Sequence, residues 1–202
     1  MNPSLAPEIL SLSLQHLRLV GIAIAIAAAL ALPTAVLLAR RPSARRWVLS
    51  LTNIAQTVPS LALFGFLLPF IGIGEHTAIF ALSLYALLPI LRSTLTGILG
   101  VDPGVRESAM AMGMTPRQIL WQVELPLAVP SIVSGVRIAT VTTIGTATIA
   151  AFIGAGGLGV FLVRGIAMMD KQALLAGALP AAAMALAADE GLEWIERKLS
   201  PA

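Results

Sequence analysis

The chain has 202 residues, of which 57% are hydrophobic and only 11% are charged, and its mean hydropathy is +0.91. A soluble domain carries about 25% charged residues, so this composition excludes a water-solvated globule and indicates a protein whose solvent is lipid. The net charge of +3 comes from basic residues that flank apolar runs, which argues against a nucleic-acid partner. The absence of cysteine excludes disulfides and cysteine-bound metal, and the two histidines are too far apart in sequence to suggest a metal site.

Five apolar segments are each long enough to cross a bilayer, which takes about 20 helical residues. They cover about residues 17–39, 48–72, 77–99, 128–153 and 172–190. The first is too long for a signal peptide, and Glu8 stands where a signal peptide would have basic residues. The second contains Pro59 and Pro69, which should break it. We predict one transmembrane domain over residues 1–202, an all-α bundle of five spans.

Lysine and arginine concentrate in the loops on one side, which predicts that this side is cytoplasmic. These residues are Arg40, Arg41, Arg45 and Arg46 after the first span, Arg106 and Arg117 after the third, with Arg92 at its edge, and Arg197 and Lys198 in the tail. The sequence therefore predicts a multi-pass protein of the inner (plasma) membrane, with its N-terminus outside and its C-terminus in the cytoplasm.

The longest polar segment is the inner loop over residues 100–126. Asp102 before Pro103 predicts a helix N-cap and first helical residue. Gly113 is placed to end that helix, at a position where we expect a positive φ. The spacing thus predicts one short helix between Asp102 and Gly113.

A second short helix is predicted from Thr115, which forms a capping box pattern with Gln118, to just before Pro126. Two such helices could act as a lever against a partner protein, with methionines filling its groove. They could equally be an amphipathic pair on lipid headgroups. A DNA-binding helix-turn-helix is disfavoured because the flanking spans tie the loop to the membrane.

The loop also carries a longer pattern, Glu107-Ser108-Ala109, then Gly113, then Val123-Glu124-Leu125-Pro126. It resembles the EAA loop of binding-protein-dependent ABC importer permeases in every spacing, with Ser108 for the middle alanine and Val123 for isoleucine. The resemblance implies a coupling helix that docks into a cleft of the ATP-binding subunit. The coupling residues it implies are Glu107, Ser108, Ala109, Gly113, Met114 and Thr115.

Segments 56–63, 85–92 and 144–159 resemble the glycine betaine/carnitine/choline branch of that family. The resemblance implies import of a small quaternary ammonium osmoprotectant and a fold similar to methionine-importer permeases. An amino-acid permease of the methionine type is the alternative. It also implies an ATPase subunit that binds ATP and Mg, a second permease chain, identical or not, and a separate extracytoplasmic binding protein. No catalytic residue, metal or cofactor is expected in this chain.

Polar residues within the fourth span are candidates for the pathway: Arg137, Thr140, Thr142, Thr143 and Thr146. The threonines fall on an arc of roughly 160° at helical spacing. They could line the route, or simply bond their own i−4 carbonyls. Arg137 could line the route, face a dimer axis or pair with a carboxylate, but we favour a structural arginine that bonds backbone carbonyls near Pro126 and Pro130.

Several other interpretations fail on their physical requirements. Residues 154–159 match G-x-G-x-x-G, but no strand precedes them, so a glycine-rich outer connection or re-entrant turn is favoured over a dinucleotide site. An ion-coupled transporter would carry intramembrane carboxylates, whereas the apolar runs contain none up to Ala188, and Asp189 and Glu190 stand only at the inner edge of the fifth run. An intramembrane enzyme would need a nucleophile–base pair. Arg92 is close enough to the inner surface to snorkel, so no role is assigned to it.

Overall fold

The structure is a computed structural model in which residues 5–199 are described, and in that range it is helical with no strand. The elements in chain order are α1 (Leu5–Ala39), α2 (Pro42–Thr57), α3 (Ser60–Ile71), α4 (Glu75–Leu99), α5 (Pro103–Ala111), α6 (Pro116–Ile119), the π-helical turn η1 (Leu120–Glu124), α7 (Leu125–Ala147), the 3-10 turn η2 (Ile149–Ile153), α8 (Gly159–Met168) and α9 (Lys171–Leu199).

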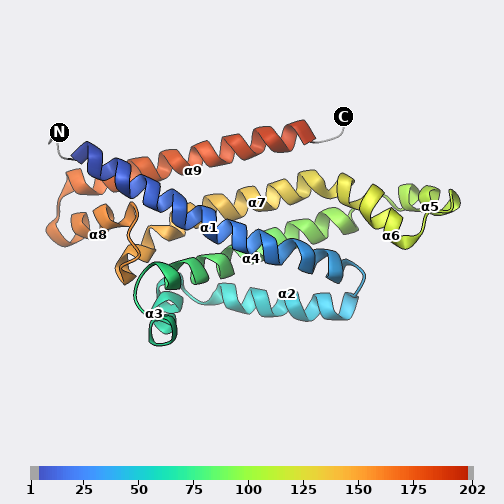
Figure 1. The fold of residues 1–202 in the computed structure, drawn as a ribbon, viewed down its shortest axis with the longest axis horizontal. Coiled ribbons are helices and arrows are strands. Elements are labelled where there is room, and N and C mark those ends of the chain that lie inside the picture. Colours follow the sequence, from blue (N-terminus) through green and yellow to red (C-terminus); the bar gives the residue numbers. More distant parts are fainter. Residues whose placement is uncertain (1–4, 200–202) are drawn as a thin grey trace.

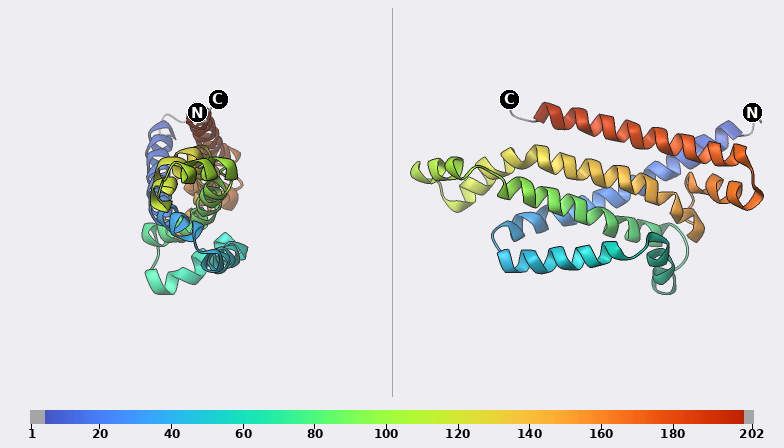
Figure 2. Two further views of the ribbon diagram at one scale, coloured as in Figure 1. Left: turned by 90° about the vertical axis from the view of Figure 1, so that its right-hand side faces the viewer. Right: turned by 180° about the vertical axis from the view of Figure 1, so that it is seen from behind.

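Four long helical stretches, α1, α4, the run from α6 to α7, and α9, follow the long axis of the molecule (Figure 1). Each is long and apolar enough to cross a membrane. The helices α5 and α6 project at one end, called here the loop end, and α8 lies at the other, the far end (Figure 2). The chain starts at the far end, and its last helix runs back toward the loop end.

The helices α2 and α3 together make a fifth span if they are counted as one, but they are bent by 98° where they meet. The bend falls at Val58-Pro59, because proline disfavours helical geometry in the residue before it and Val58 is extended, with ψ of 126°. Pro69 lies inside α3 without ending it. Of the two prolines expected to break this segment, only Pro59 does so.

The core of the bundle depends on small residues along α1. Ala23, Ala27, Ala31 and Ala35 recur every four residues and are completely buried. This spacing places them on one face of the helix, where side chains without bulk let neighbouring helices approach closely. They belong to two apolar clusters that include Ala81 and Ala86 of α4. The spans therefore pack by close backbone approach, as membrane helices do.

The sequence predicts that the second loop helix ends just before Pro126, but in the structure the helix continues past this residue. Residues 116–147 form one continuous 32-residue helical stretch. Across the π-helical turn at Leu120–Glu124 the Leu125 N–H bonds back to the Leu120 carbonyl, and Pro126, which has no N–H to donate, follows this wider turn without ending the helix. The second loop helix and the fourth span are consequently one rod.

The glycine-rich segment after the fourth span is a turn packed against α1. The Gly157 N–H donates to Gln15 Oε1 at 3.0 Å. A Cβ added to Gly159 would lie 1.9 Å from the Thr148 carbonyl oxygen, so only glycine allows this approach. The segment is a tight connection from η2 to α8 rather than a phosphate-binding loop.

Candidate coupling surface and candidate pathway

The start and end of α5 follow the sequence prediction. Asp102 Oδ1 accepts a hydrogen bond from the Gly104 N–H at 2.6 Å, and Pro103 is the first helical residue. Gly113 has φ of +81°, a left-handed conformation that a β-branched residue adopts only with strain. The N-cap and the positive-φ stop are therefore both confirmed.

The capping box that begins α6 is also confirmed. The Thr115 N–H donates to Gln118 Oε1 at 2.8 Å, and the Gln118 N–H donates to Thr115 Oγ1 at 3.4 Å. These reciprocal bonds satisfy two N–H groups that a helix start leaves unpaired. The bend between α5 and α6 is thus fixed by residues 113–118 alone.

The coupling candidates mostly point outward at the tip of the loop end. Glu107, Ser108, Gly113 and Thr115 are exposed, Met114 is half-buried, and Ala109 is buried on the inner side of α5. Two methionines that flank them, Met110 and Met112, are exposed by 56% and 75%. A small surface of flexible apolar side chains around one carboxylate is suited to docking against another protein.

Behind this surface lies a buried carboxylate that sequence reasoning did not single out. Glu124, in η1, is only 1% exposed. Its Oε2 accepts a hydrogen bond from Arg40 Nη2 at 2.8 Å, and its Oε1 lies 2.9 Å from Arg106 Nε. Arg106 Nη2 also donates to the Ile98 carbonyl at 2.7 Å. We call Arg40, Arg106 and Glu124 the arginine–glutamate cluster.

The cluster joins four elements: the end of α1, the end of α4, helix α5 and the turn η1.

A signal for the arginine–glutamate cluster was present in the sequence. Glu124 precedes Ala128 by four residues, so both lie on the same helical face, and Ala128 faces the core. A carboxylate at an inward position needs a cationic partner because burial without one is costly.

Arg137 does not bond backbone carbonyls, so the favoured interpretation of this residue was wrong. Its guanidinium lies 3.3 Å from Asp189 Oδ1 and 3.6 Å from carboxylate oxygens of Glu193 and Glu196. Two of these carboxylates, Glu193 and Glu196, lie on α9 beyond the predicted end of the span near residue 190, because the helix continues to Leu199. Arg137 therefore links α7 to α9 by ion pairs. Pairing with a carboxylate was one of the alternatives that the sequence left open for this residue.

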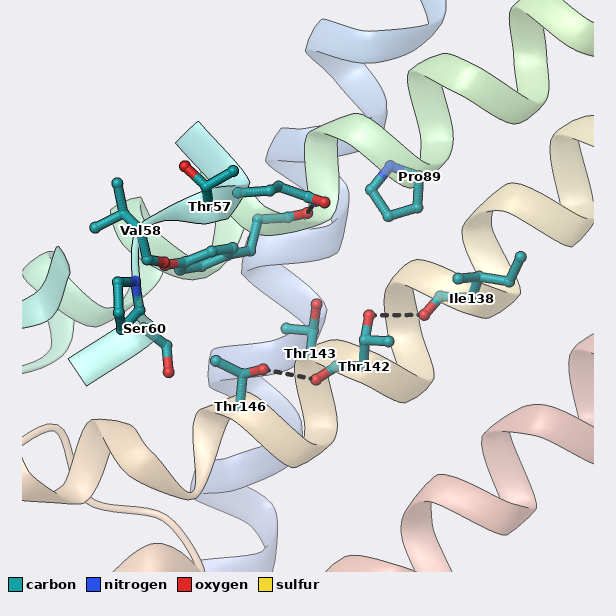
Figure 3. A pocket seen from close by; sticks show the side chains of 11 residues that line it. Thr57, Val58, Ser60, Pro89, Ile138, Thr142, Thr143 and Thr146 are labelled. Carbon is teal, nitrogen blue, oxygen red and sulfur yellow. Dashed lines mark hydrogen bonds between the residues drawn. The ribbon is translucent and has the colours of Figure 1, made fainter. Parts of the chain in front are cut away.

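A pocket of about 520 Å³ lies between α4, α7 and the bend from α2 to α3 (Figure 3). Three of the four threonines proposed for the pathway, Thr142, Thr143 and Thr146, line it, whereas Thr140 and Arg137 do not. The other lining residues are Gln56, Thr57, Val58, Pro59, Ser60, Tyr85, Pro89 and Ile138.

Two of the three α7 threonines that line this pocket bond their hydroxyls to their own helix. Thr142 donates to the Ile138 carbonyl at 2.7 Å and Thr146 to the Thr142 carbonyl at 2.9 Å (Figure 3). Thr140, outside the pocket, donates to Val136 at 2.8 Å in the same way. The hydroxyl protons of Thr142 and Thr146 are thus used, and these two side chains present methyl groups and acceptor oxygens to a solute.

Tyr85 fixes the bend that forms the opposite wall. Its hydroxyl donates to the Val58 carbonyl, and Gln56 Nε2 donates to the Tyr85 carbonyl at 2.8 Å. The bend leaves the Val58 carbonyl without a partner in its own helix, and Pro89, which has no N–H, leaves the Tyr85 carbonyl of α4 without one. The pocket is therefore held in shape by its own polar side chains.

Within residues 5–199, no group of three or more histidine or acidic side chains is arranged to hold a metal ion. The site consists of a docking surface, a buried charge cluster and a pocket between spans. Nothing in that geometry requires chemistry beyond binding and movement.

This helical bundle with an EAA-type loop defines the permease class of ABC importers. The chain belongs to the family of binding-protein-dependent transport system inner membrane components, whose pattern matches residues 12–201. It is accordingly a multi-pass membrane transport permease and not an enzyme.

The chain is similar to three characterised permeases. It is 45% identical to the carnitine transport permease OpuCD of Listeria monocytogenes, over 93% of this chain and 84% of that one. It is 47% identical to the glycine betaine/carnitine/choline permease OpuCD of Bacillus subtilis, over 87% and 77%. The osmoprotectant import permease OsmW of Salmonella typhimurium is 42% identical, over 95% and 91%.

The fold is similar to that of the methionine ABC transporter MetNI in an inward-facing conformation, with a TM-score of 0.89, 25% identity and full coverage of both chains. An amino acid ABC transporter shares the fold with a TM-score of 0.80 at 20% identity. The predicted all-α fold resembling methionine-importer permeases is therefore confirmed.

We predict that Glu124→Gln lowers the free energy of unfolding by about 2 kcal/mol, because it leaves two arginines without their shared counter-charge. The full cost of a broken buried pair is larger, but Arg40 is half exposed and water screens it. Denaturation of the purified protein in detergent measures the change. Glu107→Gln, at an exposed position on the same loop, is the matched control and should be neutral; equal effects would contradict the burial argument.

Proposed function

We propose that this chain forms one half of the membrane pathway of an ABC importer for small quaternary ammonium osmoprotectants such as glycine betaine, carnitine or choline. The observation that carries the proposal is the 42–47% identity, over most of the chain, to permeases named for these solutes. The methionine-type alternative is supported by fold similarity at only 25% identity. ATP hydrolysis in a separate subunit, which binds ATP and Mg, supplies the energy.

The pocket between α4 and α7 supports this substrate class. A quaternary ammonium group has no N–H to donate, so it does not need the strong acceptors that a primary amine would. Methyl groups, hydroxyl oxygens already used as donors, and the single ring of Tyr85 offer it weak contacts. One aromatic ring is no cage, so weak binding during passage is expected here, and tight recognition belongs to a separate extracytoplasmic binding protein.

The loop end supports docking to the ATPase subunit. Glu107 and the two exposed methionines, Met110 and Met112, form the outward surface, and the arginine–glutamate cluster holds it to the spans. Closure of an ATPase dimer would push α5, and the rod from α6 to α7 would carry the displacement to the pocket. A second permease chain completes the pathway on the other side.

The cytoplasm is proposed to face the loop end, with the N-terminus outside and the C-terminus inside. The four arginines of residues 40–46 lie at this end, and so do the exposed Trp47, Trp121 and Trp194, as expected at an interface. Reporter fusions after Ala202 and within residues 72–76 should report cytoplasmic and external locations respectively. An external reporter after Ala202 would overturn the orientation.

We expect Gly113→Val and Glu107→Lys to abolish coupling while leaving membrane insertion intact. The valine would strain the left-handed turn by about 1–3 kcal/mol, and the lysine would reverse the charge of the docking surface. ATPase pull-down and uptake into reconstituted vesicles should both fall at least about tenfold.

Two exposed positions provide controls for that experiment. Gly191→Val makes the same substitution at an exposed glycine of α9, where an added Cβ meets nothing within 4 Å, and Glu190→Lys reverses a charge on the same helix, away from the loop. Both controls should behave as wild type. If the two loop variants also keep wild-type assembly and stimulated hydrolysis, the loop is not the coupling element.

Cysteines that replace Thr142 and Thr146 should react with a membrane-impermeant thiol reagent, and the transported solute should slow the reaction. The chain contains no other cysteine, so labelling is specific. Thr77→Cys, at a completely buried position, is the unreactive control. Protection of both pocket positions to the level of this control would exclude the pocket from the pathway.

A further inference from the structure

A second, more polar pocket of about 320 Å³ lies between α4, α7 and α9. Its lining residues are Arg92, Ser93, Thr96, Pro130, Ser131, Ser134 and Glu196. Its volume is at the lower end of the range of small-molecule sites, about 300–1,000 Å³. We call it the inner pocket, and the pocket that contains Thr142 the outer pocket.

The two pockets occupy successive stretches of one groove. On α4, Tyr85 and Pro89 of the outer pocket are followed, one turn on, by Arg92 and Ser93 of the inner pocket. Residues three or four apart share a helical face, so these side chains form one stripe. Because α4 runs toward the loop end, a solute that leaves the outer pocket along this groove meets Arg92 next (Figure 1).

The α7 side of the groove has the same continuity. Thr142 and Ile138 line the outer pocket, and Ser134 and Ser131 line the inner one. These four positions are spaced by three or four residues along one helix. The α7 wall therefore carries hydroxyl groups along both pockets, and the α4 wall becomes more polar toward the loop end.

Arg92, which the sequence predicts to be close enough to the inner surface to snorkel, lines the inner pocket. It lies seven residues before the end of α4 at Leu99, or about 10 Å along the helix axis. Its Nη2 donates to Asn53 Oδ1 on α2 at 2.8 Å. An arginine at such depth normally faces water or a charged partner, and a neutral amide leaves its charge uncompensated.

The opposite wall of the inner pocket carries a negative charge. Glu196 on α9 lines the pocket and also lies 3.6 Å from Arg137. A guanidinium on one side and a carboxylate on the other match a solute with separated negative and positive groups. Arg92 has five N–H donors in a planar fork, which its bond to Asn53 does not exhaust, and this fork suits a carboxylate.

We propose that the inner pocket is a transient site for zwitterionic solutes, in which Arg92 binds the carboxylate and Glu196 faces the quaternary ammonium group. This inference rests on the proposed function and adds a selectivity to it. Glycine betaine and carnitine have the carboxylate, whereas choline has only a hydroxyl. Arg92 should therefore matter for the first two solutes and not for the third.

The test is uptake by the complete importer, reconstituted with its ATPase and binding protein, with glycine betaine, carnitine and choline as probes. Arg92→Gln should lower the maximal uptake rate of glycine betaine and carnitine about tenfold and that of choline less than about twofold. The KM for uptake should change little, because the separate binding protein sets it. Arg92→Lys, which keeps the charge but loses the fork, should give an intermediate loss for the two carboxylates.

Two controls separate this proposal from a structural role of Arg92. Arg41→Gln, the same substitution at an exposed arginine that lines neither pocket, should leave the ratio of carnitine to choline uptake unchanged. ATPase association with Arg92→Gln should equal wild type. An equal loss for all three solutes, or no loss, would overturn the carboxylate site, as would a wild type that imports choline alone. A wild type that imports none of the three would instead overturn the proposed substrate class.

Discussion

The arginine–glutamate cluster decides how the loop end can act. Among the described residues, Arg106 is the one side chain of α5 with a hydrogen bond or ion pair to another element, and both its partners, Glu124 and the Ile98 carbonyl, lie at the ends of spans. Without that charge pair α5 would be attached mainly through its flanking turns. With it, a force on the docking surface acts directly on α4 and on the rod that contains Glu124. Glu124 thus keeps α5 attached to the spans, because separating a buried carboxylate from its arginines costs free energy.

The continuity from α6 to α7 connects the arginine–glutamate cluster to the outer pocket through a single helix. A separate second loop helix would have allowed the loop to hinge against the span. The π-helical turn instead carries the helix past Pro126, and the same rod ends among the threonines of the outer pocket. A displacement at Glu124 therefore reaches Thr142 through one helix, and the contacts of Arg137 with α9 draw the last span along with it. Coupling needs no long chain of side-chain contacts in such an arrangement.

Local signals were readable from the sequence, and long-range partners were not. The Asp102 N-cap, the Gly113 turn and the Thr115 capping box depend on neighbours within a few residues, and each was predicted correctly. The extent of the helix past Pro126 was missed because a π-helical turn has no simple sequence signature. The partners of Arg137 and Glu124 lie more than 15 residues away along the chain, so periodicity could show that they need partners but not which ones.

In the proposed pathway, the distribution of polar groups along the groove predicts weak binding of the solute. The outer pocket offers only methyl groups, acceptor oxygens and one aromatic ring, while the charged residues Arg92 and Glu196 stand nearer the loop end. A deep site would hold the solute and slow its release, since tighter binding in the pathway lengthens residence there. Two shallow sites in series lower the barrier between them without trapping the solute at either. Selectivity can then be set outside the membrane, and the permease needs only to keep a zwitterion solvated by fixed charges as it crosses.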